Sequence, residues 1–152
     1  MNNYKFEFDY NDGYFLTDPN LFVKNHYPSD TIWLLTKKYI SIADFLNGPI
    51  VYADAFKQAI IPISPSKHHL EVKQNQEIIF SLKELKPIDV NNISVEITLG
   101  TYKISVKPSV NKNKAGLLEF KYTFSKRGSY DFHIKLKEEY LVTYTVNVSK
   151  KL

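Results

Sequence analysis

Cysteine is absent from this chain of 152 residues, and glycine is scarce, with five in total. The lack of cysteine excludes disulfides, a thiolate nucleophile and a cysteine-ligated metal. The shortage of glycine argues against the glycine-rich loops that hold phosphates. No apolar run approaches the length that spans a bilayer, and the first ten residues do not have the pattern of a signal peptide. We therefore expect no membrane insertion, and the compartment stays open.

Arginine is nearly absent as well, so the net charge of +4 comes almost entirely from lysine. Residues 1–62 carry 5 Lys against 7 Asp and Glu, whereas residues 63–152 carry 15 Lys and Arg against 9 Asp and Glu. In the second part the lysines alternate with apolar residues, as on the solvated face of a sheet. Because nucleic-acid readers usually cluster arginine, we expect no nucleic-acid partner.

The second half of the chain alternates apolar and polar residues with a period of two, which predicts strands with one buried face. Seven short strands with frequent turns predict an immunoglobulin-like antiparallel β-sandwich over residues 67–152. Tyr130 resembles the tyrosine near the start of the F strand in such domains, although the cysteine pair and the strand-C tryptophan of antibody domains are missing. The apolar positions of the seven runs are Leu70 and Val72; Ile78, Phe80 and Leu82; Ile93, Val95, Ile97 and Leu99; Tyr102, Ile104 and Val106; Leu118, Phe120, Tyr122 and Phe124; Tyr130, Phe132, Ile134 and Leu136; and Val142, Tyr144, Val146 and Val148.

The first part of the chain follows no single period, and it predicts a small irregular α+β lobe over residues 1–62. Residues 4–10 alternate and can form a strand. Residues 63–66 are expected to connect the lobe to the sandwich, because prolines flank and interrupt this stretch.

Three short helices are predicted within the lobe. Asp18 before Pro19 is typical of a capping residue followed by proline at the first helical position. Ser41 has an acidic residue three positions later, as in a capping box. The third helix is expected from Tyr52 to Ala59.

Patterns of catalytic residues are not found. There is no serine flanked by the glycines of a nucleophile elbow. His68 and His69 are adjacent on a predicted strand and so point to opposite faces, which does not suit a shared metal. His133 is expected on the sandwich surface, and Asp18 in a cap. We expect no metal, no cofactor and no enzymatic activity, although residue types alone leave a paired-carboxylate glycosidase open.

Aromatic residues crowd the first 33 positions. They either build the core of the lobe or form a binding surface, since tyrosine and tryptophan are frequent interface anchors. We expect Trp33 to be buried within the lobe or between lobe and sandwich. Because a lobe of this size has difficulty covering so many rings, we also expect an exposed docking face or a homodimer formed through residues 4–10 as an edge strand. The candidate docking residues are Tyr4, Phe6, Tyr14, Phe15 and Trp33.

The stretch YFLTDPNLFVKNHYPSDTIWLL, residues 14–35, combines prolines, aromatics and the only tryptophan. Together with its flanks it resembles the segment that follows the catalytic core in the kyphoscoliosis-peptidase group of transglutaminase-like proteins, which includes the cytokinesis-associated and hillarin-like members. The resemblance covers roughly residues 10–60. The matching positions are Tyr14 to Pro19, Phe22, His26, Pro28, Asp30, Trp33 to Leu35, Ile40, Ser41 and Phe45.

The resemblance implies a role without catalysis. In that family the catalytic Cys-His-Asp set lies upstream of the motif, so none of its members maps to this chain. The motif would then be a docking element of a non-catalytic accessory module. Its partner would be a catalytic half of the transglutaminase-like kind, or a cytoskeletal or cell-surface protein. The alternative is a carbohydrate-binding sandwich, which a row of exposed rings along a sheet would favour over a single apolar patch on the lobe.

Overall fold

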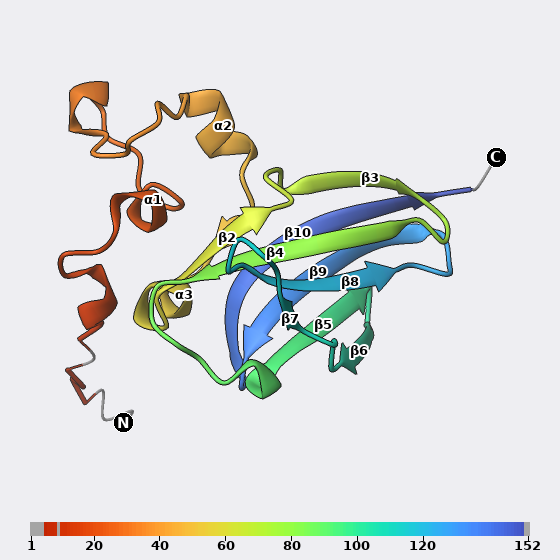
Figure 1. The fold of residues 1–152 in the computed structure, drawn as a ribbon. Helices are drawn as coiled ribbons and strands as arrows, with labels where there is room; N and C mark the ends of the chain where they lie inside the picture. Colours follow the sequence, from red (N-terminus) through yellow and green to blue (C-terminus); the bar gives the residue numbers. More distant parts are fainter. Residues whose placement is uncertain (1–4, 9, 151–152) are drawn as a thin grey trace.

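The computed structural model describes residues 5–8 and 10–150, which form a sandwich of two sheets with a loop-rich segment at one end (Figure 1). The first sheet contains, in order, β1 (Ile50–Val51), β10 (Glu139–Ser149), β9 (Gly128–Leu136), β5 (Ile93–Leu99) and β6 (Tyr102–Val106), and β3 (His69–Lys73) also pairs with β10. The second sheet has the order β2 (Ile60–Ser64), β4 (Glu77–Glu84), β8 (Leu118–Thr123) and β7 (Asn111–Lys112).

The strand order is that of an immunoglobulin-like domain. The second sheet corresponds to strands A, B, E and D, and β5, β9 and β10 correspond to strands C, F and G. The pairs are antiparallel except for β3, which runs parallel to β10. The predicted immunoglobulin-like sandwich is therefore confirmed, and each of the seven predicted strands is present.

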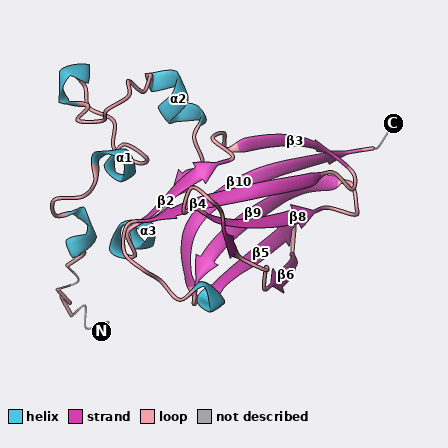
Figure 2. Cartoon of the chain, viewed as in Figure 1, coloured by secondary structure: helices cyan, strands magenta, loops and turns pink. Residues whose placement is uncertain are grey.

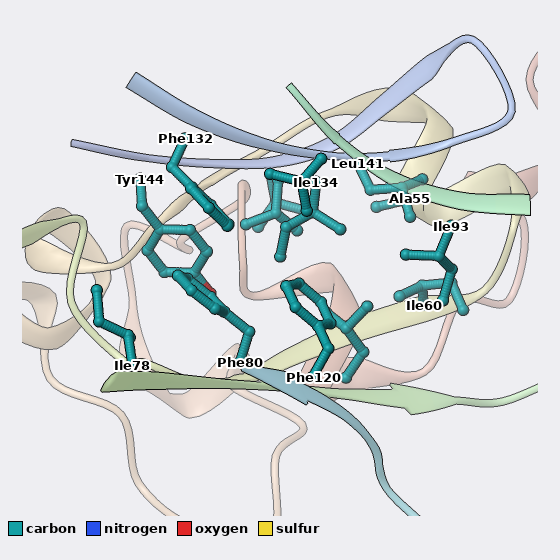
Figure 3. Close-up of a cluster of buried hydrophobic side chains, with 14 of the residues drawn as sticks. Ala55, Ile60, Ile78, Phe80, Ile93, Phe120, Phe132, Ile134, Leu141 and Tyr144 are labelled. Carbon is teal, nitrogen blue, oxygen red and sulfur yellow. The ribbon is translucent and has the colours of Figure 1, made fainter. Parts of the chain in front are cut away.

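The core of the sandwich is built from stacked aromatic rings of both sheets. Phe80 on β4 stacks on Phe132 of β9, with ring centroids 4.4 Å apart and planes inclined by 7°. Phe120 and Tyr144 lie at 5.3 Å from the same Phe80 ring (Figure 3). In antibody domains the second cysteine of the inter-sheet disulfide comes two residues after the corner tyrosine, which is the position of Phe132. The aromatic stack thus joins the two sheets where those domains have a disulfide.

Two tyrosines of the core differ in the environment of their hydroxyl groups. The hydroxyl of Tyr130 donates to the backbone oxygen of Lys126 over 3.0 Å, which is the corner contact that the F-strand pattern predicts. The hydroxyl of Tyr144 is buried and has no hydrogen-bond partner among the described residues. Burial also raises the pKa of Tyr144 well above its ordinary value.

The same change, tyrosine to phenylalanine, is expected to have opposite effects at these two positions. Tyr130→Phe removes a hydrogen bond and should lower the free energy of unfolding by about 1 kcal/mol. Tyr144→Phe removes an unpaired buried hydroxyl and should raise the free energy of unfolding by about 1 kcal/mol. Urea midpoints compared at equal m-values measure both changes. Shifts of the two variants in the same direction would contradict this assignment.

Short helices in the N-terminal part begin where their capping residues predict. The carboxylate of Asp18 accepts from the backbone N–H of Asn20 over 2.8 Å at the start of α1 (Pro19–Phe22). Ser41 and Asp44 form the expected capping box of α2 (Ile42–Asn47). The third helix, α3 (Ala53–Lys57), lies inside the predicted range. Figure 2 shows how these helices and the long loops precede the strands. Three 3-10 turns complete the elements, at Asp12–Tyr14, Thr31–Trp33 and Val90–Asn92.

Two expectations about the first part of the chain need correction. Ile63 and Ser64, expected in the connector, belong to β2, which pairs with β4 through Ile60 to Ser64. Pro62 is compatible with this strand because β2 lies at a sheet edge. The strand expected at residues 4–10 is not formed by residues 5–8 and 10, which have no ladder partner, while Tyr4 and Asp9 lie outside the described residues.

Among the helices of the described part, none is long and apolar enough to cross a membrane.

Candidate docking surface

The motif at residues 14–35 contributes few side chains to the core of the molecule. Within it only Leu21 and Val23 are buried. Leu21 joins the core cluster that the sandwich and α3 share. The remainder of the motif lies beside the sandwich, on the side of α3, and consists of loops and single helical turns (Figure 1).

Contacts with α3 fix the start of the motif. The side-chain amide of Asn11 donates to the backbone oxygen of Ala53 over 3.2 Å, and the ring of Tyr14 lies 4.6 Å from that of Phe56. Gly13 approaches the helix so closely that a Cβ there would stand 2.5 Å from the backbone carbon of Phe56. A side chain at position 13 would therefore push the motif away from α3.

His26 holds the motif together by packing. Its ring stacks on Phe22 at 4.4 Å, with planes 10° apart, and meets the edge of Tyr14 at 5.4 Å. Farther along, the hydroxyl of Tyr27 donates to the backbone oxygen of Ile40 over 3.0 Å. These contacts order the loops without covering their outer side.

The outer side of the motif is strongly apolar and exposed. Trp33 is 69 % exposed, so the prediction that it is buried was wrong. Asp30 caps the single turn Thr31–Trp33, and this turn carries the indole outward, away from the core. We call the following exposed side chains the motif surface, which has two parts: Phe15 and Leu16 near the start of the motif, and Ile32, Trp33 and Leu35 at its end.

A groove of about 290 Å³ runs beside Trp33. One wall is the stretch from Trp33 to Thr36, and the other is formed by α1 and the residues that follow it, including Phe22, His26 and Pro28. A second hollow of about 410 Å³ lies next to it, between Val23, Tyr39, Phe45 and Lys67. The groove beside Trp33 is lined mainly by apolar side chains, as ligand pockets usually are, whereas the second hollow also has Lys24, Lys38 and Asp44 in its lining.

The five candidate docking residues have different environments. Phe15 and Trp33 are exposed on the motif surface, and Phe6 is exposed before it. Tyr14 is half-buried against Phe56 and supports the surface from below. Tyr4 lies outside the described residues.

The histidines of the sandwich do not form a metal site. Nδ1 of His68 lies 3.2 Å from the backbone oxygen of Thr143. The rings of His68 and His69 meet edge to face, with centroids 4.5 Å apart. His133, expected on the surface, is half-buried with Nδ1 2.7 Å from the hydroxyl of Thr143, and burial lowers its pKa. Within residues 5–8 and 10–150, no three His, Asp or Glu side chains form a group that could hold a metal ion.

An ionic cluster on the outer face of the first sheet was not foreseen. Glu96 of β5 is buried, with its carboxylate 3.4 Å from Nζ of Lys135 and 3.0 Å from Nζ of Lys103. The hydroxyl of Tyr140 donates to the same carboxylate over 2.5 Å. Glu96 and Lys135 occupy alternate positions that the sequence pattern assigns to a solvated face. The ring of Tyr140 lies 4.9 Å from Nζ of Lys135 and shields it, and the alternation of residues does not signal this contact.

Comparisons with known proteins point to one group of proteins. The chain is 26% identical to the kyphoscoliosis peptidase of Mus musculus over 155 aligned positions, which cover 89% of this chain and 23% of the mouse protein. It is 36% identical to hillarin of Drosophila melanogaster over 58 positions, which cover 38% of this chain and 7% of hillarin. The chain thus spans less than a quarter of the length of these relatives.

Other comparisons add little beyond this similarity. No family model matches the chain. Among solved structures, the filamin domain of Lin-41 superimposes with a TM-score of 0.46 at 12% identity, covering 67% of this chain and 97% of that domain. The resemblance inferred from the motif is nevertheless confirmed by the two curated relatives, and the chain is a relative of kyphoscoliosis peptidase and hillarin that corresponds to a small part of each.

Proposed function

We propose that the chain is a non-catalytic docking module whose motif surface binds a catalytic half of the transglutaminase-like kind. The exposure of Trp33 together with its groove carries this proposal. A large aromatic ring beside an apolar groove, on a segment that the chain's own core does not cover, is the usual composition of an interface hot spot. The relatives extend well beyond the matched region, which provides a candidate for the missing surface.

The position of the exposed rings favours a protein partner over a carbohydrate. In the described residues, Tyr102 is the only large aromatic of the sandwich strands that is exposed. A single ring does not form the row of platforms that a sugar chain would need. The exposed rings are found instead in the part of the chain before the sandwich, where Phe15 and Trp33 accompany exposed aliphatic side chains.

Trp33 provides a direct test because it is the only tryptophan in the chain. Chain labelled with 5-fluorotryptophan gives one ¹⁹F resonance, which is titrated with a transglutaminase-like core from the same source, recognised by its Cys-His-Asp set. We expect the resonance to shift on binding. Trp33→Ala and Leu35→Ala should each weaken binding at least tenfold by calorimetry, as interface anchors do.

The matched control is Ile79→Ala. Ile79 is exposed on the outer face of β4, so its loss should leave the affinity unchanged. An unchanged Trp33 resonance at saturating core would overturn the proposal. Equal loss of affinity in the Ile79 and Trp33 variants would overturn it as well, since the motif surface would then have no special part in binding.

A further inference from the structure

One side of the sandwich is left open between its two sheets. Strand β7 consists of two residues and pairs with β8 only at Glu119 and Leu118. On the same side, β6 is the last strand of the first sheet and has no second neighbour among the described residues. The two sheets therefore end in unpaired edges that a further strand could extend.

Core-facing side chains are exposed at this open side. Ile104 of β6 pairs with Ile97 in the row that continues through the fully buried Phe132, yet Ile104 is 39 % exposed. Tyr102, two residues earlier on the same face, is also exposed. A groove of about 470 Å³ lies between these side chains and Tyr122 and Phe124 of the other sheet. The core of the sandwich is thus incomplete along β6.

The N-terminal segment has the pattern of a strand but no sheet. Phe6, Phe8 and Tyr10 alternate with polar residues, and all three rings are exposed. The rings of Phe8 and Tyr10 stack at 6.2 Å with planes 10° apart, so they lie on the same side of the chain. This separation is close to the spacing of about 6.6 Å between alternate residues of an extended strand.

We propose that this segment of one copy of the chain adds as a strand along β6 of a second copy. The stretch from Phe6 to Tyr10 has the same number of residues as β6 (Tyr102–Val106). The three rings of the added strand would point into the groove and cover the exposed core-facing side chains of β6. Its alternate position Glu7 would face outward on the same side as Lys103, which already pairs with Glu96 over 3.0 Å but keeps an exposed side chain. Backbone pairing with an unpaired edge is an established mode of recognition.

The donor comes from a second copy because its own chain holds it elsewhere. Asn11 is bonded to Ala53 and Tyr14 packs on Phe56, which ties the end of the segment to α3. In Figure 1 the N-terminal segment and β6 lie on opposite sides of the view. Five extended residues reach only about 17 Å, so a segment tied to α3 is not expected to reach β6 of its own chain. Reciprocal exchange between two copies closes a twofold dimer. The motif surface has no part in this contact, so the inference is independent of the docking proposal.

Sedimentation equilibrium of the full chain tests the dimer. We expect concentration-dependent dimers that Ile104→Lys, or the double change of Phe6 and Phe8 to serine, weakens at least tenfold. The control Ile79→Lys places the same charge on the outer face of the sandwich and should leave dimerisation unchanged. An equimolar mixture of the Ile104→Lys chain and the double-serine chain should recover a heterodimer, because the first supplies the strand and the second the groove. A monomer at every concentration, or dimers unaffected by these changes, overturns the proposal.

Cross-linking then identifies the contact, since the chain contains no cysteine. A Phe8→Cys copy mixed with an Ile104→Cys copy should form a mixed disulfide under mild oxidation, because Phe8 and Ile104 are the central residues of the two matched strands. Phe8→Cys with Ile79→Cys should not. A chain carrying both Phe8→Cys and Ile104→Cys should give cross-linked dimers. A disulfide within one chain, at the mass of a monomer, would show that the segment fills its own groove and would overturn the exchange. Circular dichroism confirms that each variant is folded.

Discussion

Phe132→Ala is expected to lower the free energy of unfolding by about 3–5 kcal/mol, the usual cost of removing a large buried aromatic ring. Phe132 is fully buried and stacks on Phe80 at 4.4 Å. The edges of Tyr122 and Phe124 meet it at 5.3 and 6.0 Å. Phe80 and Tyr122 belong to strands of the opposite sheet and Phe124 directly follows β8. The ladders hold this backbone in place, so the cavity cannot close. Because whole domains are stable by about 5–15 kcal/mol, this loss is a large fraction of the total.

Two further variants separate packing from a general effect of mutation. Phe132→Leu retains much of the side-chain volume and should cost less than Phe132→Ala. Ile79→Ala, at an exposed position of the neighbouring strand, should change stability by less than about 0.5 kcal/mol. Urea denaturation followed by circular dichroism gives all three values. A Phe132→Ala chain as stable as the Ile79 variant would show that the stack of Phe80 and Phe132 does not join the sheets.

The sandwich strands could be predicted because each has apolar residues on the face toward the core, and that face is buried in every predicted strand except β6. The alternation of Phe120 and Tyr122, or of Phe132 and Ile134, is the direct consequence of successive side chains pointing to opposite sides of a sheet. The strands that the sequence did not predict are those without room for alternation. Strands β1 and β7 have two residues each, and β2 contains Pro62 within a continuous apolar run. Their pairing is decided by neighbours that are distant in the chain.

Helix starts were equally predictable, since capping is a local interaction. Asp18 and Ser41 bond to backbone groups within three residues of themselves. The environment of Trp33 was not predictable in the same way. Its hydrophobicity is evident from the sequence, but burial also requires a surface that covers it. In this chain the sandwich and α3 cover Leu21 and leave the indole exposed. For that reason the sequence predicts that Trp33 is strongly apolar but does not predict its exposure.

The ionic cluster around Glu96 shows a third limit of the sequence pattern. Glu96 and Lys135 occupy outward positions of β5 and β9, where charged residues are usually solvated. The register of the ladder shifts between Tyr140 and Val142 on β10. Beside this irregularity, the Tyr140 side chain bonds to Glu96 and covers Lys135. The burial of the pair thus follows from a shift in register that alternation alone does not reveal.

Glu96→Leu is expected to destabilise the fold by about 3 kcal/mol at neutral pH, because it leaves the buried ammonium of Lys135 without its buried partner. The remaining ion pair of Lys135, with Glu138, is to a side chain that is 97% exposed, and such pairs contribute little. Adding Lys135→Met to Glu96→Leu removes the unpaired charge, so the double variant should be more stable than Glu96→Leu alone. A double variant that is less stable would contradict a buried ion pair.

Lowering the pH should reduce the difference in the free energy of unfolding between the native chain and the Glu96→Leu variant. Burial alone would raise the pKa of Glu96, but the hydrogen bonds from Tyr140 and Lys103 and the charge of Lys135 outweigh it and hold the pKa below its usual range. The contribution of an acid whose pKa is lowered by folding is present above its unfolded value of about 4.3, and it is lost as the pH falls through the folded value. Stability of both chains measured by urea denaturation from pH 7 down to about pH 3 should therefore converge. A difference that stays constant over this range would mean that the carboxylate of Glu96 contributes through its shape and not through its charge.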